Sequence, residues 1–427
     1  MKREKQRWTT GCVITAFMLV ATYAAGAADS KKRVLCFGDS ITATGTWVAS
    51  GGSDPAIETI NAGKSGRKAA EAKKPLAVYL KAYPGFLSTN METVRPSAEP
   101  NPPPAGWPEE VREIEVEASV DNTTQPMLMY TARSNEKRPL LVGLHTWSGD
   151  YRQAGGQVVY ARWCIERDWH FVHPHFRGPN WTPEACGSEK VVQDIVDAVE
   201  YMTQHANVDT SRIYLAGTSG GGYAALLMAG RTPDIWAGVS AWVPISDIRA
   251  WWEQCDEGPY SKYARHIEKA VGGRPDQNEK AAQECVKRSP VSYLSQAASV
   301  NLDINAGVTD GHKGGSVPFS HALYAYNSVV PAADRIAPYF IESFFMGQAL
   351  PEGAAKADAD PLYGDKDVIF RKISGNARVS IFMGGHEIIH QAALNWLAAQ
   401  RKGAPAVWNI EEICLIKTGK SESDSGK

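Results

Sequence analysis

The sequence lacks several features that would decide its class at once. It has no large excess of either charge, with 45 Lys and Arg against 47 Asp and Glu and a formal net charge of −2. This balance gives no indication of a nucleic-acid partner. Its seven cysteines include no C-x-x-C pair, so their spacing predicts neither a zinc site nor a disulfide framework. If an oxidising compartment allows a disulfide, the first pair to test is Cys255 with Cys285.

The first residues have the composition of an export signal. Basic residues up to Arg7 precede an apolar run from Val13 to Ala25, and small residues follow through Ala28. This order is typical of a secretory signal peptide, which we assign to residues 1–27. A retained membrane anchor is the alternative, and the small residues at the end of the run disfavour it. We therefore expect a secreted or periplasmic protein with no membrane contact after cleavage.

Composition also predicts the domain boundaries. Proline is concentrated between Arg95 and Pro108, which favours an extended, semi-rigid chain. We expect a linker at residues 89–110, between a short fragment at residues 28–88 and a catalytic domain at residues 111–416. The Ser- and Lys-rich end, residues 417–427, is expected to be disordered.

The short fragment contains a serine motif. Arg33–Phe37 has the pattern of a buried strand, the sequence G-D-S-I-T follows directly, and Ile60–Gly63 reads I-N-A-G. These blocks resemble the first part of the SGNH (GDSL) hydrolases, whose serine stands at the end of the first strand. The Asn-Asp and D-x-x-H sequences that complete that family's site occur nowhere in this chain. Because a serine without a base is a poor nucleophile, we interpret Ser40 as a relic or a structural residue.

The larger domain alternates segments typical of strands with segments typical of helices. Apolar residues at helical spacing predict a helix between Ser188 and Met202. Such alternation argues for an α/β fold, a mostly parallel sheet covered by helices on both faces. The segments expected to be strands are Val111–Val120, Met127–Ala132, Pro139–His145, Trp169–Pro174, Ile213–Ala216, Gly238–Val243, Leu302–Ala306 and Val379–Met383.

One of these strands runs into the motif G-x-S-x-G. The apolar run that begins at Ile213 breaks on glycines at 217–222 and resumes as a small-residue helix, with Ser219 at the break. A tight strand-to-helix turn exposes the serine hydroxyl and directs the helix N-terminus at the reacting centre. A glycine-rich turn that only packs a helix on a sheet is the alternative. The order of strand, motif and helix favours Ser219 as a nucleophile.

The residues that follow later strands complete a resemblance. Leu302–Ala306 leads to Asp310, and Val379–Met383 leads through Gly384-Gly385 to His386. With Ser219, this order resembles the prolyl-oligopeptidase-like branch of the α/β-hydrolases over residues 111–413. The resemblance implies that Asp310 orients His386 and that His386 is the general base. The separation of these two residues is long for that family, so an insertion around residues 325–375 is expected to loop out.

The resemblance also implies an oxyanion hole built from two backbone N–H groups. One is expected from Gly220, and the other from the loop after the strand that ends at His145. Relatives often carry His-Gly-Gly in that loop, whereas this chain has Thr146 and Trp147 after the histidine. We expect Trp147 to be the second donor, with its indole also facing the pocket. Trp251-Trp252 is expected to lie in a loop and to line the substrate pocket.

Other patterns offer alternative sites. Residues 386–390 read H-E-x-x-H, which could bind zinc if the motif lay inside a helix and a third ligand existed. We expect no metal, because Gly384-Gly385 directly precedes the motif, no histidine follows His390, and a helix is expected to begin only at Glu387. Asp303 is another candidate acid, but it lies within a strand. The histidines at 170, 173 and 175 fit structural roles better than a metal site.

These residues predict a serine hydrolase that needs no cofactor and forms an acyl-enzyme. An ester substrate is favoured over a peptide, because only about 80 residues precede the catalytic domain, too few for a gating propeller. Export and the SGNH-like fragment favour acylated polysaccharides or their fragments, an argument from fold-level analogy. The alternatives are a serine peptidase of the prolyl oligopeptidase type and, more distantly, a zinc metallohydrolase. The sequence leaves the oligomeric state open.

Overall fold

The computed structural model describes residues 32–36, 57–61 and 101–410. The chain divides into two compact units, Met1–Thr93 and Val94–Lys427. In the first unit, strands β1 (Lys32–Cys36) and β2 (Ile57–Asn61) pair in parallel. The expected signal segment, the motif around Ser40 and the tail at 417–427 lie outside the described residues.

The part of the second unit within residues 101–410 contains one nine-stranded sheet. Its strands are β3 (Arg112–Glu117), β4 (Thr124–Tyr130), β5 (Arg138–Leu144), β6 (His170–Pro174), β7 (Val208–Thr218), β8 (Gly238–Trp242), β9 (Leu302–Gly307), β10 (Val368–Ser374) and β11 (Ala377–Phe382). Their order across the sheet is β3-β4-β6-β5-β7-β8-β9-β11-β10. The neighbours from β6 to β11 in this order pair in parallel, and antiparallel strands occupy the two ends. The predicted α/β fold class is confirmed, and the topology is that of an α/β-hydrolase.

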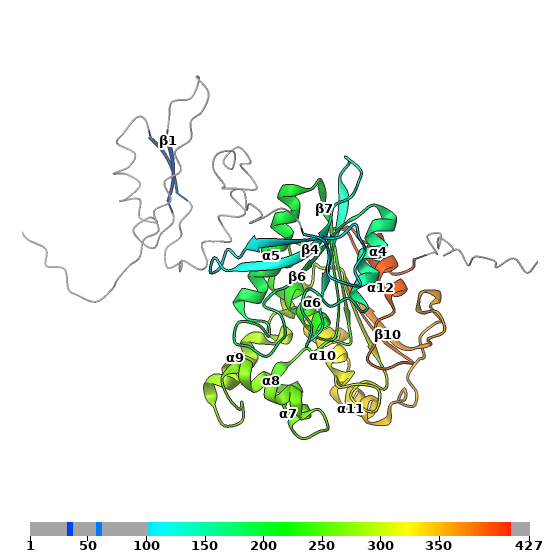
Figure 1. The fold of residues 1–427 in the computed structure, drawn as a ribbon. Helices are drawn as coiled ribbons and strands as arrows, with labels where there is room; N and C mark the ends of the chain where they lie inside the picture. The colour runs from blue at the N-terminus through cyan, green and yellow to red at the C-terminus, as the bar shows by residue number, and fades with distance from the viewer. Residues whose placement is uncertain (1–31, 37–56, 62–100, 411–427) are drawn as a thin grey trace, which may run out of the picture. The chain divides into compact units, whose positions relative to one another are not determined.

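Helices cover both faces of this sheet (Figure 1). They are α4 (Gln157–Arg167), α5 (Glu189–His205), α6 (Gly220–Arg231), α10 (Ser320–Val329), α11 (Pro338–Gly347) and α12 (His390–Ala399). Strand β5 shows how the faces divide, because Leu140 packs into one core and Leu141 into the other. The first core includes residues of α5, α6, α10 and α11, and the second includes residues of α4 and α12. Short 3-10 turns lie at Pro290–Ser292, Leu294–Ala297, Ala332–Asp334 and Pro361–Tyr363.

Three further helices between β8 and β9 form a cap with its own core. They are α7 (Ile248–Asp256), α8 (Ser261–Val271) and α9 (Glu279–Arg288), which lie together below the sheet in Figure 1. Helix α7 begins where the side chain of Asp247 accepts hydrogen bonds from the N–H groups of Arg249 and Ala250. The expectation that Trp251-Trp252 lies in a loop is therefore wrong.

Two other expectations are corrected by the fold. The segment 325–375 does not loop out as an insertion, because it contains the end of α10, all of α11 and strand β10, and Phe344 of α11 is fully buried in the core. Cys255 and Cys285 do not form a disulfide; both thiols are free and buried in the cap core.

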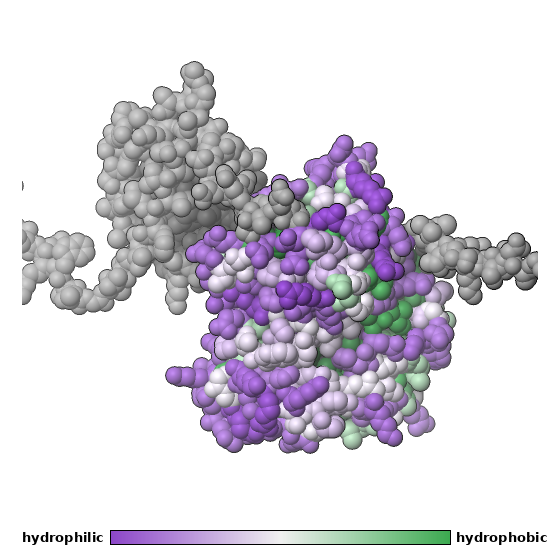
Figure 2. All heavy atoms as spheres, viewed as in Figure 1, coloured by the Kyte–Doolittle hydropathy of each residue, from purple (hydrophilic) through white to green (hydrophobic). Residues whose placement is uncertain are grey.

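The face seen in Figure 2 is largely hydrophilic, with apolar side chains gathered in smaller areas. Exposed apolar residues include Tyr339 and Met346 of α11 and Ile373 of β10. Among the described residues, no helix is both long and apolar enough to span a membrane.

Candidate active site

Ser219 occupies the turn between β7 and α6. Its backbone has φ 60° and ψ −120°, a conformation that costs a non-glycine residue free energy and persists only where the surroundings impose it. Here the N–H of Ser219 donates to the carbonyl of Trp242 at 2.9 Å, and its own carbonyl accepts from the N–H of Tyr223 at 2.8 Å. These two bonds hold the strained turn, and the half-buried side chain stands at the carboxyl end of a central strand.

Asp310 and His386 meet beyond the ends of β9 and β11. Because these strands are parallel neighbours, the loops at their carboxyl ends lie at the same edge of the sheet as Ser219. The Nδ1 of His386 donates to Oδ2 of Asp310 at 2.7 Å. A neutral imidazole with its proton on Nδ1 has a lone pair on Nε2, so His386 can accept a proton there.

The carboxyl group of Asp310 is completely buried, whereas the His386 side chain is 24% exposed. Burial raises the pKa of Asp310 above its ordinary value, and the hydrogen bond from His386 opposes this shift. The second oxygen of Asp310 accepts from the N–H groups of Gly311 and Val317. Gly315 must be a glycine, since a Cβ there would lie 2.1 Å from Asp310 Oδ1 and 2.5 Å from His386 Cβ.

The backbone of Trp147 lies directly against that of Gly220. A Cβ on Gly220 would be 2.2 Å from the backbone nitrogen of Trp147, so only glycine allows this approach. Gly220 begins α6, where the first N–H groups have no partner within the helix. Among the described residues, neither the N–H of Gly220 nor that of Trp147 donates one of the backbone hydrogen bonds found in turns, loops and helix caps. Both can therefore donate to a bound anion.

The side chain of Trp147 differs from expectation. Its indole is 2% exposed and packs in the cap core, and its Nε1 donates to Nδ1 of His266 at 3.3 Å. The expectation that the indole faces the pocket is wrong. The carbonyl of Trp147 accepts a hydrogen bond of 2.9 Å from the backbone N–H of the buried Asn180, which was not among the expected site residues. Asn180 follows a strand and has no motif around it, so the sequence gives no signal for this hydrogen bond to the Trp147 carbonyl.

Trp251 and Trp252 do not line a substrate pocket through exposed rings. They are 1% and 3% exposed and pack inside the cap. A signal for this was present, because Ile248, Trp251, Trp252 and Cys255 are spaced as one face of a helix. Asp303, the other candidate acid, is buried within β9 and pairs with Arg378 at 2.7 Å, so it belongs to the interior of the sheet.

The H-E-x-x-H residues do not share a helix. Helix α12 begins at His390, not at Glu387 as expected, so His386 lies in the preceding loop. The two histidines also have separate partners, because Nε2 of His390 contacts the carbonyl of Gly156 at 2.9 Å while His386 pairs with Asp310. Within the described part of the chain, no group of three or more His, Cys, Asp or Glu residues is arranged to hold a metal ion. His173 lies in the interior, and its Nδ1 contacts the carbonyl of Gly143.

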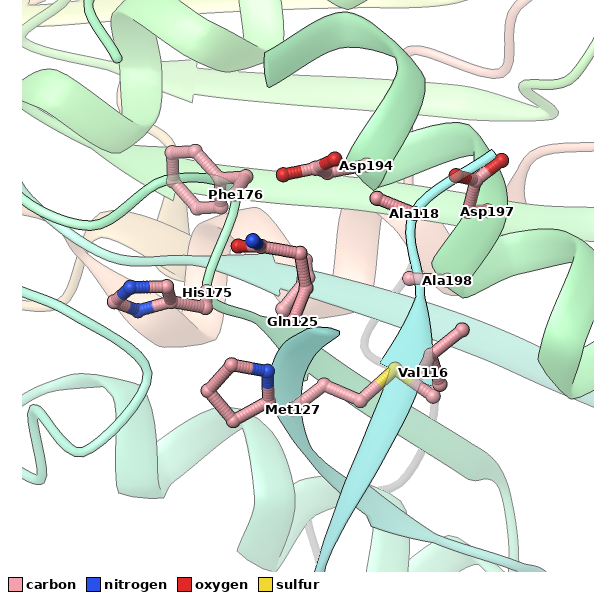
Figure 3. A pocket seen from close by; sticks show the side chains of 11 residues that line it. Val116, Ala118, Gln125, Met127, His175, Phe176, Asp194, Asp197 and Ala198 are labelled. Atoms are coloured by element: carbon pink, nitrogen blue, oxygen red, sulfur yellow. The ribbon is translucent and has the colours of Figure 1, made fainter. Parts of the chain in front are cut away.

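A small cavity, shown in Figure 3, is lined by none of the candidate catalytic residues. Asp194 and Asp197 of α5 border it opposite Gln125 of β4, and His175 lies nearby. Its volume is about 10 Å³, which is room for about one water molecule. It is therefore too small for an organic substrate.

Comparison with protein families finds a match over part of the chain. Residues 162–330 match the Prolyl oligopeptidase family. The matched segment contains Ser219 and Asp310 and ends before His386. Dipeptidyl aminopeptidase BIII of Pseudoxanthomonas mexicana is 27% identical over 184 residues, which are 39% of this chain and 25% of that protein. The chain thus matches about a quarter of the length of this curated relative.

Solved structures with related folds include peptidases and an esterase. Uncomplexed acylaminoacyl peptidase from Pyrococcus horikoshii has a TM-score of 0.41 and 17% identity, with coverage of 51% of this chain and 34% of that chain. Acetyl xylan esterase from Paenibacillus sp. R4 has a TM-score of 0.43 and 18% identity, with coverage of 55% of this chain and 80% of that chain.

Proposed function

We propose that this chain is a serine hydrolase in which Ser219 is the nucleophile, His386 the general base and Asp310 the residue that orients His386. The observation that carries the proposal is the 2.7 Å hydrogen bond between His386 and Asp310, at the sheet edge where Ser219 occupies a strained turn. His386 takes the hydroxyl proton as Ser219 attacks an acyl carbon, and then returns it to the leaving group. Water then attacks the acyl carbon while His386 takes its proton, and His386 returns that proton to the Ser219 oxygen as the bond to the acyl group breaks.

The N–H groups of Gly220 and Trp147 complete the proposed site. Attack on a carbonyl places negative charge on its oxygen, and two fixed N–H donors stabilise that charge without reorganising. Two observations support this role. The two backbones approach each other closely. Among the described residues, neither N–H donates a backbone hydrogen bond in a turn, loop or helix cap.

Carboxylic esters are the proposed substrates, with acylated polysaccharides or their fragments as the natural class. The signal-like first 27 residues, from which we propose export, and the SGNH-like fragment support this choice. Glu387, the carboxylate that follows the base, pairs with Lys366 at 2.9 Å, so this carboxylate is not a free counter-charge for the amino terminus of a peptide. A bound ammonium group requires such a counter-charge.

A serine peptidase is the second candidate. The match of residues 162–330 to the Prolyl oligopeptidase family supports it, as does the named activity of the dipeptidyl aminopeptidase relative. Esters and amides pass through the same kind of acyl-enzyme, so the proposed catalytic residues are the same for both.

Parallel assays of one preparation test the choice of substrate. We expect hydrolysis of 4-nitrophenyl acetate and release of acetate from an acetylated oligosaccharide, with little release of 4-nitroaniline from proline or dipeptide anilides. The Ser219→Ala variant is the background control for every substrate. If kcat/KM for a dipeptide anilide exceeds that for the esters, the protein is a peptidase rather than an esterase, and the proposed catalytic residues remain the same.

A further inference from the structure

Trp251 lies in the cap, yet it contacts the loop that carries Asp310. Its ring is 1% exposed, and its Nε1 donates a hydrogen bond of 2.9 Å to the carbonyl of Ser316. This bond joins α7 to the loop between β9 and α10. A buried indole N–H needs an acceptor, and here the acceptor belongs to the candidate active site.

The acceptor is part of the peptide group that also contacts Asp310. The carbonyl of Ser316 and the N–H of Val317 belong to one planar peptide unit. That N–H donates to Oδ1 of Asp310 at 3.2 Å. Oδ2 of the same carboxylate accepts from His386 at 2.7 Å. A continuous hydrogen-bonded chain therefore runs from Trp251 through the 316–317 peptide and Asp310 to His386.

We propose that Trp251 is a positioning residue that fixes the orientation of the 316–317 peptide and thereby the donor that holds Asp310. The proposal rests on the proposed function, because Asp310 and His386 must act as acid and base for the effect to be seen. A donor on the carbonyl prevents the peptide plane from rotating. It also polarises the N–H at the other end of the plane, which strengthens its bond to the carboxylate.

The same ring also packs against the loop that provides the second proposed oxyanion donor. The rings of Trp251 and Trp147 meet edge to face with centroids 4.7 Å apart, and the backbone of Trp147 lies against Gly220. One buried residue of the cap thus contacts both the acid loop and the oxyanion loop.

Trp252 provides a matched control in the same helix. It is 3% exposed, and its Nε1 donates to Oε1 of Glu268 at 3.1 Å, a bond between α7 and α8 within the cap. Replacing either tryptophan by phenylalanine removes a similar volume and one indole N–H. The variant at 251 also loses the bond to the acid loop, and the variant at 252 does not.

The experiment compares Trp251→Phe with Trp252→Phe on 4-nitrophenyl acetate across a range of pH. For Trp251→Phe we expect kcat to fall about tenfold, the effect of one ordinary hydrogen bond, with KM within about twofold of wild type. Among the described residues, the titratable side chain that contacts Asp310 is His386. A weaker N–H donor favours the protonated carboxyl, so the acid limb of the profile should move to higher pH. Trp252→Phe should leave kcat and this limb unchanged.

A second variant separates hydrogen bonding from packing. Trp251→benzothienylalanine keeps the shape of the ring and lacks the N–H, and it should reproduce the loss of kcat without a large change in melting temperature. The proposal is overturned if both changes at 251 match Trp252→Phe in kcat and pH profile while Ser219→Ala is inactive. A Ser219→Ala enzyme with wild-type turnover would instead overturn the proposed function.

Discussion

His386 and His390 are four residues apart, but their rings have different partners. His386 pairs with Asp310, whereas His390 contacts the carbonyl of Gly156 and lies 5.4 Å from the ring of Tyr160. Burial lowers the pKa of His390, which is typical of a residue that packs in its neutral form. We therefore expect His386→Ala to lose at least a thousandfold in kcat with little change in melting temperature.

The companion variant His390→Ala should behave in the opposite way. It loses a packed ring and a hydrogen bond, so we expect it to retain most of the wild-type kcat and to lose about 1–2 kcal/mol of unfolding free energy. Turnover of 4-nitrophenyl acetate and urea unfolding measure both effects in both variants. An active His386→Ala enzyme would refute the assignment of the base.

The order of the candidate residues could be predicted from the sequence, but their surroundings could not. Ser219, Asp310 and His386 each follow an apolar strand, and parallel neighbours bring such ends to one edge. The positions of Trp147 and Trp251 depend on the cap, whose packing no local pattern specifies. For Trp251 the helical spacing was readable, whereas its bond to Ser316 joins residues 65 positions apart.

At the scale of elements, the junction of β7 with α6 requires glycine at position 220. In Gly220→Ala the new methyl group would meet the backbone of Trp147, so the loop must move and its N–H with it. We expect kcat to fall by about 10²-fold, the usual effect of losing one oxyanion donor. Alanine favours the helix itself, so helix destabilisation would not explain the loss.

Gly347→Ala is the control for this substitution. Gly347 is the last residue of α11, and a Cβ there would meet nothing within 4 Å. We expect wild-type kcat and a melting temperature that is unchanged or slightly raised. If Gly220→Ala shows the same kcat as this control, the proposed contact between the two oxyanion donors is wrong.

The strands of the sheet were easier to predict than the segments outside it. Each expected strand of residues 111–383 overlaps an observed one. The strands buried in the parallel part of the sheet have a continuous apolar pattern, whereas the antiparallel edge strand β3 alternates exposed and buried residues. Strand β10 and helix α11 were missed. Strand β10 is a half-buried edge strand whose register depends on pairing with β11, and the apolar residues of α11 match no single helical face.

For the molecule as a whole, buried histidines make stability depend on pH. Burial lowers the pKa of His321 from 6.5 to about 4. The neutral ring has a partner at each nitrogen, because Nδ1 accepts from the N–H of Ser246 and Nε2 donates to Oε1 of Gln254. Between these values the unfolded chain binds the proton more readily, so unfolding free energy is full above pH 6.5 and falls as the pH drops towards 4. Between pH 6.5 and pH 5, protonation of the unfolded chain at this histidine should lower the free energy of unfolding by roughly 2 kcal/mol.

Urea unfolding of wild type and His321→Gln at pH 7 and pH 5 tests this statement. The variant is expected to be less stable at pH 7 and to lose less stability on acidification, because its side chain does not titrate. Other ionisable groups are shared by the two proteins and cancel in the difference. Equal losses in the two proteins would show that His321 is not kept neutral by burial.

Catalysis is proposed to depend on one nucleophile, Ser219, and covalent labelling tests this directly. A fluorophosphonate probe should modify the wild-type chain at Ser219, as located by peptide mass spectrometry. Turnover of 4-nitrophenyl acetate should fall in proportion to the fraction of chains that carry the label. Ser219→Ala should show neither label nor turnover, while Ser40→Ala should keep both, because the sequence has no D-x-x-H to supply Ser40 with a base. Label and turnover that persist in Ser219→Ala and disappear in Ser40→Ala would contradict the account.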